Sequence, residues 1–411
     1  MVSESAIAGY APVAREGGAA VTVLGGVRIP ALDGVRGLAI LIVLIHNASW
    51  VLASSTSLPM KLVIATTSTG WIGVQLFFVL SGFLITSILL DTRESPHYLR
   101  NFYIRRVLRI FPLYYAFLFV ALVIAPRFAD PGWAAVAREN QWWLWTFTFN
   151  WGAPLGHSIL GLPHLWSLAV EEQFYLFWPF LVLLLSRRQL TALCIGALVL
   201  TPLIRLALRL DGLPVGAAYE FTVARWDALA GGALVAILLT TDSGRAWPAK
   251  VLEPAGLGTL ALIAIITLAT HNFSESAIWT QVIGQSLTIL LFSWVVYAGV
   301  VPGTRFERAI HRAASKPWLR FLGKYSYAIY LFHYPFHTIA SNYLADAVNG
   351  EDDLWRLARW GLYVASIASA SIVAALCSWR WLERPFLNLK DRLTVAGGSS
   401  THSIRRADSH T

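Results

Sequence analysis

Uninterrupted apolar runs recur along the whole chain of 411 residues. Examples are GLAILIVLI (37–45), LYYAFLFVALVIA (113–125) and TLALIAIITLA (259–269). Inside a bilayer the chain itself must hydrogen-bond every backbone N–H and C=O, so only helices and closed barrels cross membranes. These runs lack the alternating polarity of a barrel strand. The sequence therefore predicts an all-α fold, a polytopic transmembrane helical bundle.

Charged residues make up 13% of the chain, against about 25% in a soluble domain. So few charges cannot cover a water-facing surface. Grouping the apolar runs predicts about ten spans: 37–55, 71–90, 110–126, 172–186, 189–207, 227–241, 252–270, 277–300, 319–342 and 357–381. Residues 142–156 are apolar but short and broken by Gly and Pro, so we expect a re-entrant or interfacial segment there.

The distribution of charge predicts the orientation of these spans. With this threading, two arginine-rich loops, around 93–109 and 305–320, fall on one side, and the acidic loop 346–353 falls on the other. Basic loops face the cytoplasm, so an even number of spans places both termini there, in a multi-pass protein of the plasma or inner membrane. Anchoring explains the net charge of +9, and we expect no nucleic-acid partner.

The predicted organisation has three parts. Residues 1–30 form a cytoplasmic N-terminal segment, 31–388 the transmembrane domain, and 389–411 a disordered cytoplasmic tail that is small and polar. Cys194 and Cys377 lie singly in apolar segments without ligand spacing, so we expect no metal site.

Polar residues inside the spans are the candidates for chemistry, because burying a charge there costs about 2.5 to 3.5 kcal/mol. In the first span, Arg36 lies in the opening turn and His46 follows ten residues later, about 15 Å along a helix. Arg36 could instead extend to the interface, and His46 could be a packed, hydrogen-bonded side chain. In the next span, Ser81 and Gly82 would permit close approach of a neighbour or a ligand.

A basic segment, FYIRRVLRIFPLYY (102–115), carries Arg105, Arg106 and Arg109 at the membrane edge. Positive-inside anchoring is one explanation. The alternative is an anion site, because guanidinium groups bind phosphate bidentately and coenzyme A carries several phosphate charges.

The segment LPHLWSLAVEEQFYLFWP (162–179) carries the densest group of polar residues at the mouth of a span. On a helix Ser167 and Glu171 share a face, whereas Glu172 points about 100° away, so we expect one carboxylate to act and the other to meet water. We predict that substrate contacts come from His164, Trp166, Ser167, Glu172, Gln173 and, in YSYAIYLFHYPF (325–336), His333.

Taken together, these segments resemble the membrane acyltransferase-3 family. Six motifs occur in the family's order: LDGVRG with the Arg-to-His helix, FFVLSGFLIT, YIRRVLRIFPLYY, HLWSLAVEEQFYLFWP, YSYAIYLFHYP and WLERPF. The resemblance implies transfer of an acyl group from acyl-CoA, most often acetyl-CoA, to a hydroxyl of a glycan or another sugar-containing acceptor. It also implies that His46, Arg36 and Glu171 are catalytic and that Arg105, Arg106 and Arg109 bind the donor.

Two positions depart from the family pattern. Nine residues separate Arg36 from His46 where the family usually has ten, so Asn47 stands at the expected histidine position. One residue turns a helix by about 100°, which affects where His46 points. Gln75 stands where members often carry an acidic residue.

The predicted mechanism uses neutral His46 as the base for the acceptor hydroxyl, because histidine titrates near neutral pH. Glu171 or another carboxylate orients the ring, and Arg36 contacts donor phosphate or the oxyanion. Either the acceptor is cytoplasmic or the site opens to both sides of the membrane. The rival hypotheses are a transporter that uses intramembrane His, Arg and Glu, and a membrane scaffold or sensor.

Overall fold

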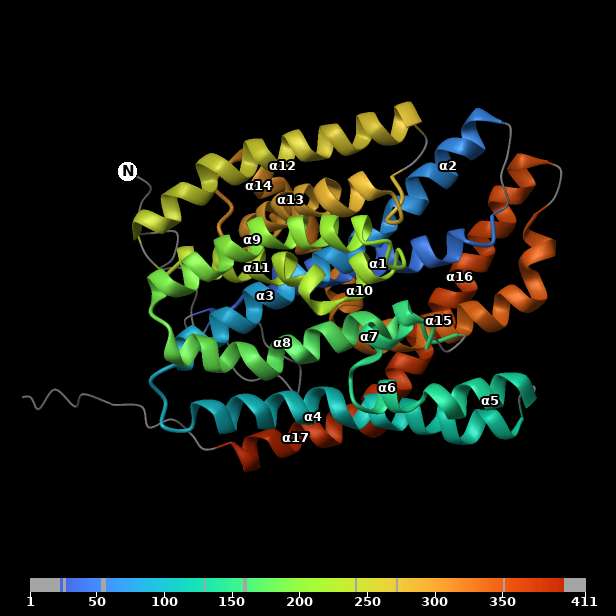
Figure 1. The fold of residues 1–411 in the computed structure, drawn as a ribbon, viewed down its shortest axis with the longest axis horizontal. Helices are drawn as coiled ribbons and strands as arrows, with labels where there is room; N and C mark the ends of the chain where they lie inside the picture. The colour runs from blue at the N-terminus through green and yellow to red at the C-terminus, as the bar shows by residue number, and fades with distance from the viewer. Residues whose placement is uncertain are drawn as a thin grey trace, which may run out of the picture.

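A computed structural model describes residues 23–24, 27–52, 57–128, 131–157, 161–240, 242–270, 273–349 and 352–394. In this part of the chain the fold is a bundle of long helices, and α3 (Ile72–Thr92), α4 (Tyr98–Phe119), α8 (Leu165–Leu184) and α9 (Arg187–Leu210) run roughly along its long axis (Figure 1). The β-structure is one antiparallel pair of two-residue strands, β1 (Val23–Leu24) and β2 (Val27–Arg28). The all-α prediction is confirmed.

The N-terminal half of the bundle consists of α1 (Pro30–Ser49), α2 (Leu58–Ser68), η2 (Thr69–Trp71), α3 (Ile72–Thr92), α4 (Tyr98–Phe119), η3 (Val120–Ile124), η4 (Ala125–Arg127), α5 (Pro131–Asn140), α6 (Trp142–Trp145), α7 (Phe149–Gly152), η5 (Ala153–Leu155) and α8 (Leu165–Leu184). The C-terminal half consists of α9 (Arg187–Leu210), α10 (Ala217–Glu220), η6 (Thr222–Ala224), α11 (Trp226–Leu238), α12 (Asp242–Thr270), η7 (Thr280–Gly284), α13 (Gln285–Val300), α14 (Arg305–Ala314), α15 (Pro317–Val348), α16 (Asp353–Ser378), η8 (Trp379–Glu383) and α17 (Arg384–Leu393).

Eight helical segments of the described residues are long and apolar enough to cross a membrane. They coincide with eight of the ten predicted spans, and the other two correspond to the 13-residue α11 and to α15. The chain is therefore a multi-pass membrane protein. Residues 142–155 form only short helices, α6, α7 and η5, none of which is long enough to cross.

Glycines allow α1 and α15 to pack with their backbones in contact. A Cβ atom built on Gly37 would lie 1.9 Å from the carbonyl oxygen of Leu319, and one on Gly323 would lie 1.6 Å from that of Asp33. Only glycine fits at such a crossing, and small residues let helices in a membrane approach closely. This contact fixes the end of α1 that carries Arg36 against α15.

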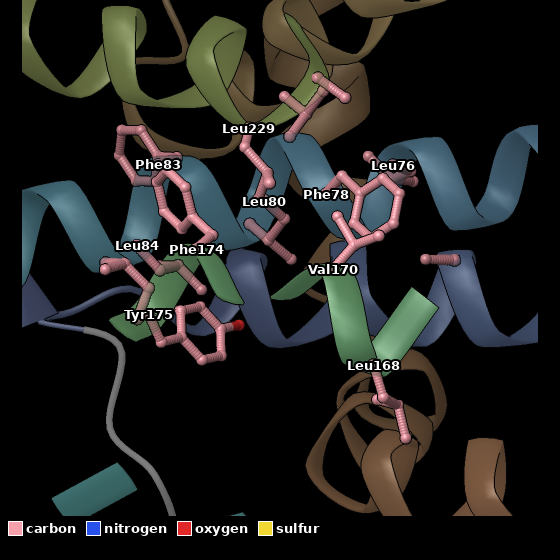
Figure 2. Packing of buried hydrophobic residues seen from close by; sticks show 14 of the residues in the cluster. Leu76, Phe78, Leu80, Phe83, Leu84, Leu168, Val170, Phe174, Tyr175 and Leu229 are labelled. Atoms are coloured by element: carbon pink, nitrogen blue, oxygen red, sulfur yellow. The ribbon is translucent and has the colours of Figure 1, made fainter. Parts of the chain in front are cut away.

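A second close crossing joins α3 to α11. A Cβ atom on Gly82 would lie 1.9 Å from the carbonyl oxygen of Leu229, and one on Gly232 would lie 1.8 Å from that of Val79. Figure 2 shows buried side chains of α3, α8 and α11 around this crossing, among them Leu80 and Phe174. The prediction that Gly82 permits close approach of a neighbour is confirmed.

The C-terminal boundary differs from the prediction. Helix α17 continues to Leu393 and packs along α4, so 389–393 are helical where a disordered tail was predicted (Figure 1). The amphipathic helix α17 packs against α4, a contact that composition alone does not reveal. The predicted N-terminal segment up to residue 22 and the tail from residue 395 lie outside the described residues.

Candidate active site

A charged cluster occupies the end of the bundle where α1 begins. Glu171 of α8 accepts hydrogen bonds from the hydroxyl of Ser81 at Oε1 (2.7 Å) and from that of Tyr175 at Oε2 (3.2 Å). Arg36 and Arg106 both interact electrostatically with this carboxylate. The structure thus brings together Glu171, Arg36 and one arginine of the basic motif, from three separate helices.

The three arginines of the basic motif have different environments. The guanidinium of Arg106 is half-buried and lies 4.9 Å from the centre of the Tyr175 ring. Arg109 is half-buried, interacts electrostatically with Glu383, and has one buried nitrogen, Nη1, without a hydrogen-bond partner in the described part of the chain. Arg105 is exposed. Arg106 and Arg109 therefore belong to the charged cluster, whereas Arg105 lies on an exposed part of α4.

Glu172 does not face open water. It is half-buried and interacts electrostatically with Arg106, and it also acts on Tyr114 and Tyr115 of α4. This carboxylate is thus only partly exposed, where open water was expected, because side chains of α4 lie beside it.

His46 lies in a second polar cluster, near the other end of α1. Its side chain is 7% exposed, so it faces the protein interior rather than lipid. Its Nδ1 lies 3.1 Å from the carbonyl oxygen of Thr67. A carbonyl only accepts, so Nδ1 carries the proton and Nε2 holds the lone pair. Nε2 makes no hydrogen bond to any residue that the structure describes.

The atom that orients His46 therefore differs from the expected one. The carbonyl of Thr67 takes this part, and Glu171 is bonded instead to Ser81 and Tyr175 in the first cluster. The length of α1 explains why Glu171 does not reach His46. Glu171 lies near Arg36, and Arg36 and His46 are about 15 Å apart along the helix axis.

Asn47 points to a different neighbour from His46. Its Nδ2 lies 2.8 Å from Nε2 of His333, whose Nδ1 lies 2.6 Å from the carbonyl oxygen of Tyr330. The consistent assignment has Asn47 donating to Nε2 and His333 donating from Nδ1. Both nitrogens of His333 are therefore occupied, unlike those of His46.

Hydroxyl groups lie between the two clusters. Ser167 Oγ is 2.6 Å from the hydroxyl of Tyr330, which also donates to the carbonyl of His164 at 3.0 Å. Ser167 is one helical turn from Glu171, and Tyr330 is one turn from His333. The imidazole of His164 donates from Nε2 to Leu331 O (3.2 Å), and its buried Nδ1 has no partner among the described residues. Polar groups thus extend from Glu171 to the histidines.

Two predicted substrate contacts have structural partners. Gln173 donates to the carbonyl of Phe147 (2.7 Å) and to Asn150 Oδ1 (2.8 Å), so it holds the short helices 142–155 against α8. The ring of Trp166 lies 5.1 Å from the guanidinium carbon of Arg225. These contacts support packing of the bundle rather than direct recognition of a ligand.

A further polar centre lies beside Trp166. Arg205 and Asp227 form a fully buried salt bridge of 2.7 Å, and the fully buried Arg225 lies over the rings of Phe78, Trp166 and Tyr219. Burial raises the pKa of Glu220, in the short helix α10, to about 8, although Arg225 opposes the rise. Arg225 and Asp227 were the available signals, as charged residues at the start of an apolar segment.

Comparisons with known proteins agree on one family. The Acyl_transf_3 family model, described as an acyltransferase domain, matches residues 29–379. The peptidoglycan O-acetyltransferase OatA of Listeria monocytogenes is 30% identical over 386 residues, which cover 87% of this chain and 55% of that protein. A Staphylococcus aureus protein named putative O-acetyltransferase is 28% identical over 378 residues, 87% of this chain and 57% of its own.

A Bacillus subtilis protein named putative peptidoglycan O-acetyltransferase YrhL is 30% identical over 325 residues, 75% of this chain and 48% of its own length. The chain thus spans about half the length of these curated relatives. No solved structure matches it.

Proposed function

This chain belongs to the Acyl_transf_3 acyltransferase family, and on that premise we propose that it is a membrane O-acetyltransferase. Its donor is acyl-CoA, with acetyl-CoA preferred, and its acceptor is a hydroxyl group of a cell-surface glycan. The names of two relatives, which specify peptidoglycan, support this class of acceptor. Each matches the chain over only about half of its own length, so the acceptor here needs its own test.

The observation that carries the proposal is the state of His46. Its Nδ1 donates to Thr67, so the tautomer is fixed, and its Nε2 is unbonded within the described residues. A neutral imidazole with a free lone pair is the general base that an alcohol needs near neutral pH. His333 lacks this property, because Asn47 occupies its Nε2.

The arginine cluster fits the phosphates of the donor. Arg36, Arg106 and Arg109 interact electrostatically with one another, and guanidinium groups bind phosphate bidentately. The unpartnered Nη1 of Arg109 is a donor without an acceptor in the described structure. Bound coenzyme A would supply phosphate oxygens for it and a thioester as the activated acyl group.

The transfer step follows from these positions. His46 Nε2 takes the proton of the acceptor hydroxyl while that oxygen bonds to the thioester carbonyl carbon. The C–S bond then breaks, the new ester is released, and the imidazolium returns the proton to the sulfur to give the free thiol. Arg36 lies about 15 Å along α1 from His46, a separation that an extended pantetheine arm could bridge.

The same arrangement supports an orientation in the membrane. We place the arginine-bearing end and both termini in the cytoplasm of a plasma or inner membrane, because basic loops stay on that side. The donor then enters from the cytoplasm, and the acceptor reaches His46 from the opposite end. A site open to both sides of the membrane would let a cytoplasmic donor and an acceptor on the opposite side meet at His46.

The test is transfer by the purified full-length chain in nanodiscs. We expect radiolabelled acetyl from acetyl-CoA to appear on a solubilised glycan acceptor such as a peptidoglycan fragment. Liposomes that contain the protein, with labelled acceptor outside, test the rival transporter. Uptake of unmodified acceptor without acetylation would contradict the proposed enzyme and support a transporter.

A further inference from the structure

A carboxylate outside the recognised motifs interacts with His46. Glu275 lies in the connection between α12 and η7, and it is half-buried. Within the described residues it is the acidic group that acts electrostatically on His46, and it also acts on Tyr219. Glu171, the acid of the W-S-L-x-x-E motif, belongs instead to the arginine cluster.

Packing places this connection beside His46 independently of charge. A Cβ atom on Gly70 would lie 2.5 Å from Cβ of His46, so η2 and the histidine are in direct contact. The next residue, Trp71, donates from Nε1 to the carbonyl of Phe273 (2.9 Å), and its ring stacks on that of Phe273 at 5.6 Å. Both rings are buried. Phe273, two residues before Glu275, is therefore held against η2, the turn that contacts His46.

The turn that carries Glu275 is itself ordered. Ser274 accepts a hydrogen bond from the backbone N–H of Ser276 (3.2 Å), and its carbonyl accepts one from Ala277 (3.2 Å). A carboxylate held in this way can stabilise a charge that develops nearby without first reorganising.

We infer that Glu275 is a positioning residue for His46, stabilising the imidazolium that forms when Nε2 takes the proton of the acceptor hydroxyl. This inference rests on the proposed function. Thr67 fixes the tautomer and Glu275 supplies the negative charge, so two groups share the task that one aspartate performs in a Ser-His-Asp triad. The other nearby titratable group on a neighbouring helix is His333, which is bonded on both nitrogens and carries no negative charge.

The experiment compares Glu275→Gln with wild type in full-length protein in nanodiscs, with labelled acetyl-CoA as donor. We expect kcat to fall about tenfold, as loss of a nearby charge in a partly desolvated site predicts, while KM for acetyl-CoA changes less than about twofold. Glu275→Asp should restore most of the loss. The control Asp211→Asn removes an exposed charge at the end of α9 and should leave kcat unchanged.

A double-mutant comparison separates this function from a structural one. If Glu275 acts through His46, adding Glu275→Gln to His46→Ala should cause no further loss, because residues that act as a unit are non-additive. Wild-type kcat in Glu275→Gln, or an additive loss in the double variant, overturns the inference and leaves the proposed function intact. If wild type transfers no acetyl group, the proposed function fails and the inference fails with it.

Discussion

Nδ2 of Asn47 lies 2.8 Å from Nε2 of His333, joining the last turn of α1 to the middle of α15. The preceding residue, His46, is directed instead toward Thr67 and Gly70. Adjacent residues on a helix differ by about 100°, so a shift of one position separates a histidine that faces η2 from a side chain that faces α15. Asn47 thus occupies Nε2 of His333, whereas Nε2 of His46 has no hydrogen bond within the described residues. The first prediction concerns His46.

His46→Ala should reduce acetyl transfer by about 10²- to 10⁴-fold, the usual contribution of a general base. Truncating this buried imidazole also removes its hydrogen bond to Thr67, so the free energy of unfolding should fall by about 1 to 3 kcal/mol, and activity is compared per amount of folded protein. The matched control is His97→Ala, at the start of α4 and outside both clusters. Full activity of His46→Ala would remove this residue from the mechanism.

Arg106→Gln should raise KM for acetyl-CoA by about tenfold, because a hydrogen bond to a charged group contributes about 1.5 to 3 kcal/mol. Its neighbour provides the control, since Arg105 has the same chemistry but is exposed. Arg105→Gln should leave KM within about twofold of wild type. Steady-state kinetics over a range of donor concentrations measures both. Equal effects of the two substitutions would contradict donor binding by Arg106 and favour membrane anchoring as the function of the basic motif.

Asn47→Leu should destabilise the protein by about 1 to 3 kcal/mol, because Nε2 of His333 would be buried without a donor. The change is seen as a lower Tm in detergent solution. Ser49→Ala serves for comparison, since within the described residues the hydroxyl of Ser49 donates only to the carbonyl of His46 in its own helix (2.7 Å). We expect a smaller shift from it. A Tm unchanged by Asn47→Leu would show that the bond contributes nothing to stability.

Gly82→Ala should lower Tm by an amount equivalent to at least about 1 to 3 kcal/mol, because the added methyl group would lie 1.9 Å from the carbonyl oxygen of Leu229. Helices α3 and α11 would have to move apart, which would also displace Ser81 from Glu171. In Gly196→Ala the methyl group meets open space, so we expect no loss of stability and a slight gain. Wild-type Tm in Gly82→Ala would contradict the close crossing.

Much of the fold follows from local features of the sequence. In lipid each span must satisfy its own backbone hydrogen bonds, so a long apolar run is enough to predict a helix without knowledge of its neighbours. The short helices of 142–155 were predictable in the same way, from Gly and Pro within an apolar segment. The grouping of Arg36, Arg106 and Glu171 is less local, and it was anticipated through the order of family motifs.

Other features depend on which faces of the helices meet. Arg105 and Arg106 are adjacent and chemically identical, and only the packing of α4 against the bundle leaves the first exposed and the second half-buried. Glu172 was expected to meet water, yet it is half-buried beside Tyr114 and Tyr115 of α4. The polar centre of Arg205, Arg225 and Asp227 likewise forms from segments that carry no recognisable spacing in the chain.

The sequence by itself therefore determined that the chain is a multi-pass helical bundle with its polar chemistry in a few segments, because those properties arise within single helices. The tertiary structure decided which polar groups meet: His46 with Thr67, Asn47 with His333, and Glu171 with Ser81. These pairs are separated by tens to hundreds of residues, and side-chain partnership depends on the rotation and crossing of packed helices. Apolar periodicity does not encode that rotation to within one residue.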